Sequence, residues 1–329
     1  MRALVTGVVA VALAAVVAVS GQQQGQEVKV FGSKTITHVG FVANDAKKTA
    51  AAFADVFGAE VSDIADVKPA GFPKGYQGDR KAYTRVVNVR FDNLVLEVAQ
   101  PMGGPSPWRD FLDKYGEGVH HIAFDVNGLE DQVHLLESKG GKRVVGAAGS
   151  TDALVDLMPQ LGINLELHKT TMAPPPAAPR DPKAKASGGI KTIARIGLMI
   201  GDTDAFRAAY VDLFGVTIPP PVNERGALKF PTGFAGDPTA GMRHVFVPFD
   251  NLWINVIQPI GGESPWRDMV ARHDGYFLFA VDDVEGTAQA LEKKGGRRTL
   301  GQTGTSYAYV DMPQLGMTVF LLKSGVLPR

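Results

Sequence analysis

The stretch Gly118–Val126, GVHHIAFDV, is an apolar segment with a histidine pair in its middle. In a β-strand alternate side chains point to opposite faces, so this stretch places three apolar side chains on one face: Ile122, Phe124 and Val126. That face is typical of a packed core. The opposite face carries His121, and the pattern therefore predicts an imidazole that points into a cavity or toward solvent.

Three other predicted strands carry a metal-binding type of side chain at the same kind of position. His38 lies in ITHVGFV, Glu97 in NLVLEVAQ and Glu166 in INLELHK. Carboxylates inside apolar strands are costly to bury without a partner. Two imidazoles and two carboxylates suit one divalent ion such as Zn, Ni, Mn, Fe or Co. The four residues therefore predict a metal site, although for His121 alone a hydrogen-bonded, half-buried histidine is the simpler interpretation.

The order of these strands, with histidine, glutamate, GxHHIAF and glutamate in turn, resembles the vicinal-oxygen-chelate superfamily. This superfamily includes glyoxalase I, bleomycin resistance proteins, methylmalonyl-CoA epimerase and extradiol dioxygenases. The resemblance covers nearly everything after the N-terminal leader. It implies an α+β fold of two tandem modules, each a pair of βαβββ units that form a curved mixed sheet around a cavity. It also implies metal ligands on the first and fourth strands of each unit, which His38, Glu97, His121 and Glu166 match.

An internal repeat supports the two modules. NLVLEVAQPMGGPSPWRDF returns as NLWINVIQPIGGESPWRDM, and MPQLGINLELHK returns as MPQLGMTVFLLK. At the four ligand positions the second copy has Arg195, Asn255, Tyr276 and Phe320. These residues do not form a metal site, so we expect the second module to be structural or to bind something else. The first module must then supply all four ligands itself.

Composition excludes several classes of function. The chain has 329 residues, about two average domains, with 34 basic and 34 acidic side chains and no cysteine. The absence of a basic surplus argues against a nucleic-acid partner. Without cysteine there is no disulfide, no thiolate metal site and no cysteine nucleophile.

The N-terminus, MRALVTGVVAVALAAVVAVSGQ, has a basic residue, an Ala/Val run and small residues, which is typical of a secretory signal peptide. A retained membrane anchor is the alternative. We therefore expect an exported protein, periplasmic or secreted, with no membrane contact beyond the leader. The predicted organisation is a signal peptide (1–20), a disordered spacer (21–32), an N-terminal module with the metal site (33–169), a Pro/Ala-rich linker (170–189) and a degenerate C-terminal module (190–325).

Other side chains have competing interpretations. Strand alternation places His120 on the core face, and His168 is expected beside Glu166 or on the surface rather than as a ligand. Arg85 is a candidate contact for an anionic substrate, or else an interstrand residue.

Two segments also have competing interpretations. The SPWRD segment with Trp108 and Arg109 recurs in the second copy, which favours a structural turn. The Gly/Pro-rich stretch 67–80 is either a lid or an ordinary surface loop.

The resemblance implies a metal that acts as a Lewis acid on a small substrate with two neighbouring oxygens, while a carboxylate moves a proton. By similarity to glyoxalase I, Glu166 is expected to be the catalytic base and Glu97 its partner. An extradiol-type dioxygenase and a non-catalytic, antibiotic-sequestering binding protein are the alternatives. Export argues against the glutathione-linked reaction of glyoxalase I itself, and the sequence leaves the reaction open.

Overall fold

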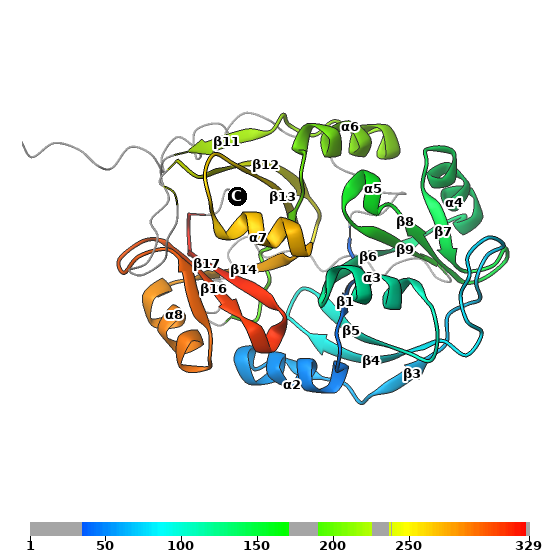
Figure 1. Ribbon diagram of the computed structural model, residues 1–329, viewed down its shortest axis with the longest axis horizontal. Coiled ribbons are helices and arrows are strands. Elements are labelled where there is room, and N and C mark those ends of the chain that lie inside the picture. Colours follow the sequence, from blue (N-terminus) through cyan, green and yellow to red (C-terminus); the bar gives the residue numbers. More distant parts are fainter. Residues whose placement is uncertain (1–34, 171–189, 226–236, 238, 327–329) are drawn as a thin grey trace, which may run out of the picture.

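The computed structural model describes residues 35–170, 190–225, 237 and 239–326. The predicted signal peptide (1–20), the spacer (21–32) and the linker after Thr170 lie outside these residues. The described chain forms two curled mixed sheets with a few helices (Figure 1). This confirms the predicted α+β fold of two tandem modules. Of the helices in the described ranges, none is long and apolar enough to cross a membrane.

The first sheet is built from two βαβββ halves that meet in its middle. Its strand order is β2-β4-β5-β1-β6-β9-β8-β7, with β3 beside β4. Strand β1 pairs parallel with β5 and antiparallel with β6, so the two halves join through β1 and β6. The strands are β1 (His38–Val42), β2 (Glu60–Val61), β3 (Ala65–Val67), β4 (Tyr83–Arg90), β5 (Val95–Met102), β6 (Gly118–Val126), β7 (Lys142–Val145), β8 (Asp152–Asp156) and β9 (Asn164–Lys169).

The helices of the first module follow from local capping signals. In α2 the Asp45 side chain accepts a hydrogen bond from the Lys48 amide at the start, and Gly58, with φ of 64°, ends the helix in the left-handed conformation. Ser106 caps α3 in the same way and is followed by a proline at the first helical position. The helices are α2 (Ala46–Phe57), α3 (Pro107–Tyr115), α4 (Leu129–Ser138) and α5 (Met158–Leu161).

The second sheet repeats the strand order of the first, β11-β12-β13-β10-β14-β17-β16-β15. Its strands are β10 (Arg195–Met199), β11 (Val222–Arg225), β12 (Gly241–Pro248), β13 (Trp253–Ile260), β14 (Gly275–Val281), β15 (Arg297–Leu300), β16 (Tyr307–Met312) and β17 (Met317–Lys323). Its helices are α6 (Thr203–Phe214), α7 (Pro265–Arg272), α8 (Val284–Lys293) and the 3₁₀ helix η1 (Pro313–Leu315).

The modules share one hydrophobic core between their sheets. Phe53 and Phe57 of α2 pack against Phe277 and Phe279 of β14, and the rings of Phe57 and Phe279 stack with centroids 4.8 Å apart. This shared core also takes the side chains of β1 that alternate with His38, such as Phe41.

The β4–β5 turn of the first module and the β12–β13 turn of the second make hydrogen bonds between the modules, from asparagines that correspond in the sequence repeat. The Asn93 side chain donates to the carbonyl oxygens of Ile193 and Asn251, while the Asn251 side chain donates to the carbonyl of Ile36. The shared core therefore holds one face of each sheet.

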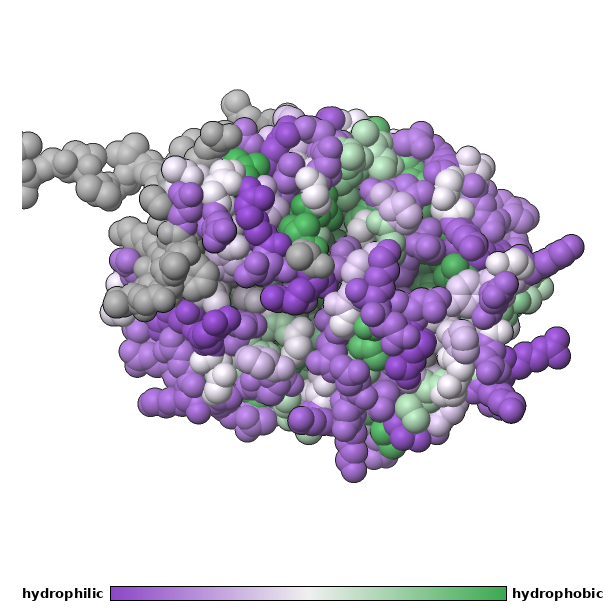
Figure 2. Space-filling model, in the orientation of Figure 1, coloured by the Kyte–Doolittle hydropathy of each residue, from purple (hydrophilic) through white to green (hydrophobic). Residues whose placement is uncertain are grey.

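The opposite face of each sheet has a hydrophobic cluster of its own, and we call it the inner face. In the first sheet it carries His38, Gly40 and Val42 of β1, and its cluster includes Trp108 and Phe111 of α3. The face seen in Figure 2 is mostly hydrophilic, with apolar residues in small patches.

Candidate metal centre

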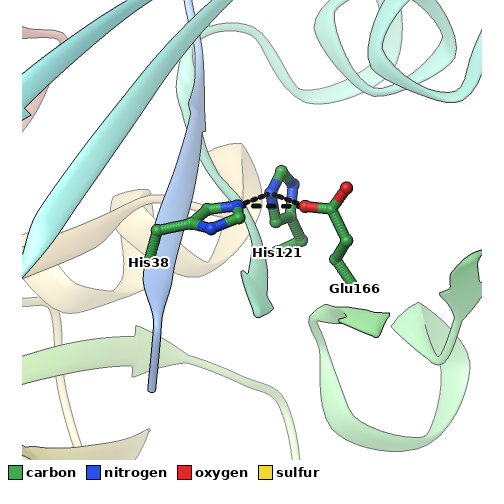
Figure 3. Close-up of side chains that lie close together, drawn as sticks. All are labelled: His38, His121 and Glu166. Atoms are coloured by element: carbon green, nitrogen blue, oxygen red, sulfur yellow. Dashed lines mark hydrogen bonds and ion pairs between the residues drawn. The ribbon is translucent and has the colours of Figure 1, made fainter. Parts of the chain in front are cut away.

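Three of the four predicted ligand residues meet on the inner face of the first sheet. His38 comes from β1, His121 from β6 and Glu166 from β9, and their donor atoms point toward one another (Figure 3). His38 Nε2 lies 3.2 Å from His121 Nε2 and 3.0 Å from Glu166 Oε2. His121 Nε2 lies 2.9 Å from the same carboxylate oxygen. The three atoms form a nearly equilateral triangle.

This triangle has the dimensions that a metal ion imposes on its ligands. With metal–ligand bonds of about 2.1 Å, neighbouring ligand atoms lie about 3.0 Å apart in octahedral geometry and about 3.4 Å apart in tetrahedral geometry. Two imidazole nitrogens and one carboxylate oxygen are also the donor types that divalent transition metals bind. The residues therefore fit a divalent ion, and within the described part of the chain no second group of three or more such ligands comes together.

Glu97, the fourth predicted ligand, stays outside this triangle. It lies half-buried on β5, where it pairs with Gly40 of β1 and Asn88 of β4. Its carboxylate is not among the donor atoms that lie within 4.8 Å of one another. Burial lowers the pKa of His38 and Glu166 raises it, and the charge of Glu97 adds a smaller increase. The role of Glu97 as a ligand stays a prediction.

The electrostatics of the triangle favour a charged carboxylate. Burial alone raises the pKa of Glu166, but the charge of His121 and the hydrogen bonds from His121 and His38 lower it well below its usual range. Burial lowers the pKa of His38, and the hydrogen bond to Glu166 with its charge outweighs this, so that the pKa is raised. Glu166 is therefore ionised at neutral pH and holds the two imidazoles around it.

His120 corrects a prediction, because the structure places it on the inner face rather than on the core face. Strand β6 has a β-bulge opposite Gly40 and Phe41, where the pairing passes from His121 directly to Val119. The extra residue is His120, and the bulge breaks the strict alternation on which the prediction relied. The His120 ring is fully buried, with Phe111 at a centroid distance of 5.1 Å and Trp108 at 6.0 Å.

The position of His120 fixes the orientation of His121. Their Nδ1 atoms lie 2.9 Å apart, and burial with the nearby His121 lowers the pKa of His120 well below its usual range. His120 is therefore neutral, and one proton lies between the two Nδ1 atoms. When His121 donates from Nε2 to Glu166, this proton belongs to His120 Nδ1; when it belongs to His121 Nδ1, the lone pair of His121 Nε2 is free for a metal ion. In this second, metal-binding tautomer the proton of His120 lies on Nε2 and needs an acceptor.

Asn164 supplies that acceptor when its amide is assigned from the hydrogen-bond network. Its Nδ2 lies 3.1 Å from His120 Nε2, while its Oδ1 is buried without a partner. With the amide as it stands, Nδ2 donates to the Nε2 lone pair of His120; in the metal-binding tautomer the exchanged amide would place Oδ1 against the Nε2 proton. A hydrogen-bonded chain then runs from Asn164 through His120 and His121 to Glu166.

Gly40 provides the space for the His121 ring. A Cβ atom at Gly40 would lie 1.9 Å from His121 Cε1, far inside any real contact. Gly197 stands in the same relation to Tyr276 in the second module, at 2.0 Å. The central strand of each module therefore carries a glycine because an aromatic ring lies directly over it.

His168 lies at the open side of the triangle. Its Nε2 is 3.7 Å from Glu166 Oε2, and its side chain is 34% exposed. Its ring centroid lies 5.5 Å from that of His38. The residue therefore lies between the Glu166 carboxylate and solvent.

The remaining predicted residues take clear positions. Arg85 lies on the same face of β4 as the shared-core residues Val87 and Val89, away from the metal cluster, and its guanidinium binds Asp66 at 3.0 Å. This geometry gives no support to a substrate contact. Arg109 donates to the carbonyl of Pro101, an intramolecular anchor of α3.

The stretch 67–80 packs against the inner face. Phe72 and Tyr76 contact its hydrophobic cluster, and the Tyr76 hydroxyl donates to Asp110 at 2.5 Å. The segment therefore covers part of the face that carries the metal cluster.

Comparisons with known proteins show which sequences and structures this chain resembles. Residues 37–155 match the family model described as the Glyoxalase/Bleomycin resistance protein/Dioxygenase superfamily. Mitochondrial methylmalonyl-CoA epimerase from Mus musculus is 29% identical over 105 residues, which cover 32% of this chain and 52% of the epimerase. The Homo sapiens protein is 30% identical over 105 residues, 32% of this chain and 53% of its own length. The chain thus spans about half the length of these curated relatives.

A solved structure shows the same fold over most of the chain. A triple mutant of 4-hydroxymandelate synthase from Streptomyces coelicolor aligns with a TM-score of 0.53 and 12% identity, covering 88% of this chain and 92% of that one. At this identity the match concerns the fold alone. Together with the family model it confirms the resemblance that the strand order indicated.

Proposed function

We propose that this chain, whose residues 37–155 match the glyoxalase/bleomycin resistance protein/dioxygenase superfamily, is a divalent-metal-dependent enzyme that transfers a proton on a small molecule with two neighbouring oxygens. The observation that carries the proposal is the triangle of His38, His121 and Glu166 with edges of 2.9–3.2 Å. The epimerase relatives support it, because epimerisation requires removal and return of a proton.

A divalent ion bound by the triangle would polarise a substrate oxygen and so acidify the neighbouring C–H bond. Within the chain, Glu166 is the proposed proton acceptor, because its carboxylate is ionised and lies in the triangle. His120 holds His121 in one tautomer during this step. His168, 3.7 Å from the Glu166 carboxylate and partly exposed, carries the proton between Glu166 and solvent. Glu97 on the neighbouring strand is proposed as the partner carboxylate.

The experiment combines metal content with isotope exchange. The full chain is loaded separately with Zn, Ni, Mn, Fe(II) and Co, and incubated in D₂O with methylmalonyl-CoA or hydroxyacetone. We expect about one ion per chain and deuterium at the carbon next to the carbonyl, with both lost in His121→Ala. The matched control is His134→Ala, because His134 is exposed on α4. Stoichiometric metal without exchange on either substrate would contradict the proton-transfer proposal.

A second candidate follows from the number of ligands that meet. Two histidines and one carboxylate are also the facial set of non-haem Fe(II) oxygenases, which leave several positions open for substrate and O₂. This extradiol-type alternative predicts oxygen uptake with catechol by the Fe(II)-loaded protein. Uptake without deuterium exchange would favour it over proton transfer.

We also propose that the protein is exported and acts on a small molecule outside the cytoplasm. The support is the Ala/Val run behind Arg2 and the small residues Ala18 and Ser20. N-terminal sequencing of the protein from an expressing bacterium tests this, with Gly21 as the expected first residue. An intact N-terminus in the cytoplasmic fraction would contradict export.

A further inference from the structure

The second module buries a guanidinium at the position where the first module has His38. Arg195 on β10 is 8% exposed, with its guanidinium carbon 4.6 Å from the ring centroid of Phe246 and 5.9 Å from that of Trp253. Among the described residues no carboxylate forms an ion pair with it, and burial lowers its pKa. A buried charge without an ion-pair partner is unfavourable, so an anion bound beside Arg195 would be stabilising.

The polar groups around Arg195 include donors without an acceptor. Asn255 Nδ2 donates to the Tyr276 hydroxyl oxygen at 2.7 Å, which leaves the phenol proton of Tyr276 free to be donated elsewhere, while Asn255 Oδ1 is buried without a partner. The hydroxyl of Tyr309, whose ring lies 5.7 Å from that of Tyr276, is buried beside the Trp266 indole and has no acceptor for its own proton. Both tyrosines lie close enough to interact with the charge of Arg195. The cluster therefore presents a guanidinium and two phenol protons to one place.

His244 adds another unsatisfied group to the same face. Both of its ring nitrogens are buried without a partner, and its ring lies 4.6 Å from that of Phe246. Burial, together with the charge of Arg195, lowers its pKa to about 4. At neutral pH His244 is uncharged and supplies one further N–H donor.

Glu224 is the acidic side chain that could serve as an internal counter-ion to Arg195. It lies on the edge strand β11, near enough to influence Tyr276 and Tyr309. It makes no ion pair with Arg195, and burial raises its pKa. In the described structure Glu224 therefore does not neutralise the guanidinium.

The side chains around this place are mostly aromatic or aliphatic, and several of them are partly exposed. Phe320 and Leu322 of β17 pack against the inner cluster of the second sheet and remain partly exposed, as do Phe246 and Trp253. Aromatic faces next to a fixed guanidinium suit a carboxylate attached to an apolar body, because Arg binds carboxylates in a bidentate manner. A phosphate would place two charges against a single cation in apolar surroundings.

We propose that the inner face of the second sheet is a binding site for a small aromatic or apolar carboxylate, held by the Arg195 guanidinium and the hydroxyls of Tyr276 and Tyr309. The site is separate from the metal cluster and needs no metal. It gives a function to the residues that stand in the place of the metal ligands.

The test uses the full chain after treatment with EDTA, with benzoate, benzamide and phosphate as probes. Trp253 lies beside the guanidinium, so its fluorescence reports binding, and calorimetry gives the affinity. We expect saturable benzoate binding, with benzamide and phosphate at least tenfold weaker. Arg195→Met should remove benzoate binding without loss of resistance to urea, and Tyr276→Phe should weaken it several-fold.

Two further variants distinguish this site from the metal centre and from an internal ion pair. His121→Ala should leave benzoate binding unchanged. The test of this site therefore holds whether or not the first module binds a metal. Glu224→Gln should keep benzoate affinity within about threefold. The proposal is overturned if benzoate does not bind the parent chain, if benzamide binds equally well, or if Arg195→Met keeps the affinity.

Discussion

The two modules have the same strand order, but the side chains on their inner faces differ in chemistry. On the inner face of the first sheet, polar atoms form a continuous chain from Asn164 to Glu166. On the corresponding face of the second sheet, Tyr309 stacks on Phe320 with ring centroids 4.1 Å apart, and Arg195 lies without an acidic partner in the described structure. The shared core lies on the other side of both sheets. Because that core holds the fold together, the inner faces are free to differ in chemistry.

The difference between the modules also includes one inserted residue. From Val119 to Ile122 the first copy pairs four residues against Val39–Phe41, whereas Gly275–Phe277 pairs without a bulge against Ile196–Leu198. The inserted residue is His120, which orients His121. The metal centre therefore depends on a change of backbone register as well as on ligand identity.

The largest expected effect comes from Gly40→Ala. The new Cβ would lie 1.9 Å from His121 Cε1, so the imidazole must leave the triangle, and we expect metal affinity to fall at least about a hundredfold. Gly197→Ala is the matched control, because it should displace Tyr276 and cost roughly 1–3 kcal/mol of stability while the metal stays bound. Competition titration and urea unfolding measure the two effects. Equal metal loss in both variants would show that the modules are not independent.

The second prediction concerns acid sensitivity of the second module. The pKa of His244 is about 4 in the folded chain because the ring is buried, against about 6.5 when unfolded. Between these values the unfolded state binds the extra proton, so stability falls as the pH decreases from 6.5 to 4, by roughly 3 kcal/mol. His244→Leu should lose this part of the pH dependence. Denaturant unfolding of both proteins at pH 7.5 and 4.5 measures the difference, and parallel pH profiles would contradict the prediction.

The third prediction tests the inserted residue. His120→Leu keeps the buried volume but removes the acceptor for His121 Nδ1–H, so we expect a 10- to 100-fold loss of metal affinity. Phe277→Leu on the unbulged strand β14 also replaces a fully buried ring, but in the shared core, and should leave metal affinity unchanged. Thermal unfolding shows whether a loss of metal affinity comes from a misoriented His121 or from a destabilised fold. Unaltered affinity in a folded His120→Leu protein would show that His121 does not need this partner.

Much of this architecture could be predicted from the sequence, because alternation and the repeat are local signals. They placed His38, His121 and Glu166 on strands and showed that the second copy lacks the ligands. The bulge could not be predicted by assuming period 2, and one extra residue reversed the face of His120. The substrate contact of Arg85 stays a prediction, since the face of β4 on which it lies depends on pairing with β5 rather than on residue type.

The smallest expected effect is that of Glu97→Gln on metal affinity, which we compare with that of Glu166→Gln. Glu166 lies in the triangle and its carboxylate contacts both imidazoles, so Glu166→Gln should weaken metal binding at least about a hundredfold. Glu97 acts on His38 through its charge from the neighbouring strand, and at the same position the second module has Asn255. We therefore expect Glu97→Gln to weaken binding by about tenfold or less. A loss equal to that of Glu166→Gln, measured by the same titration, would make Glu97 a direct fourth ligand and favour the lyase or isomerase chemistry. A negligible loss would leave the three-ligand set that oxygenases use.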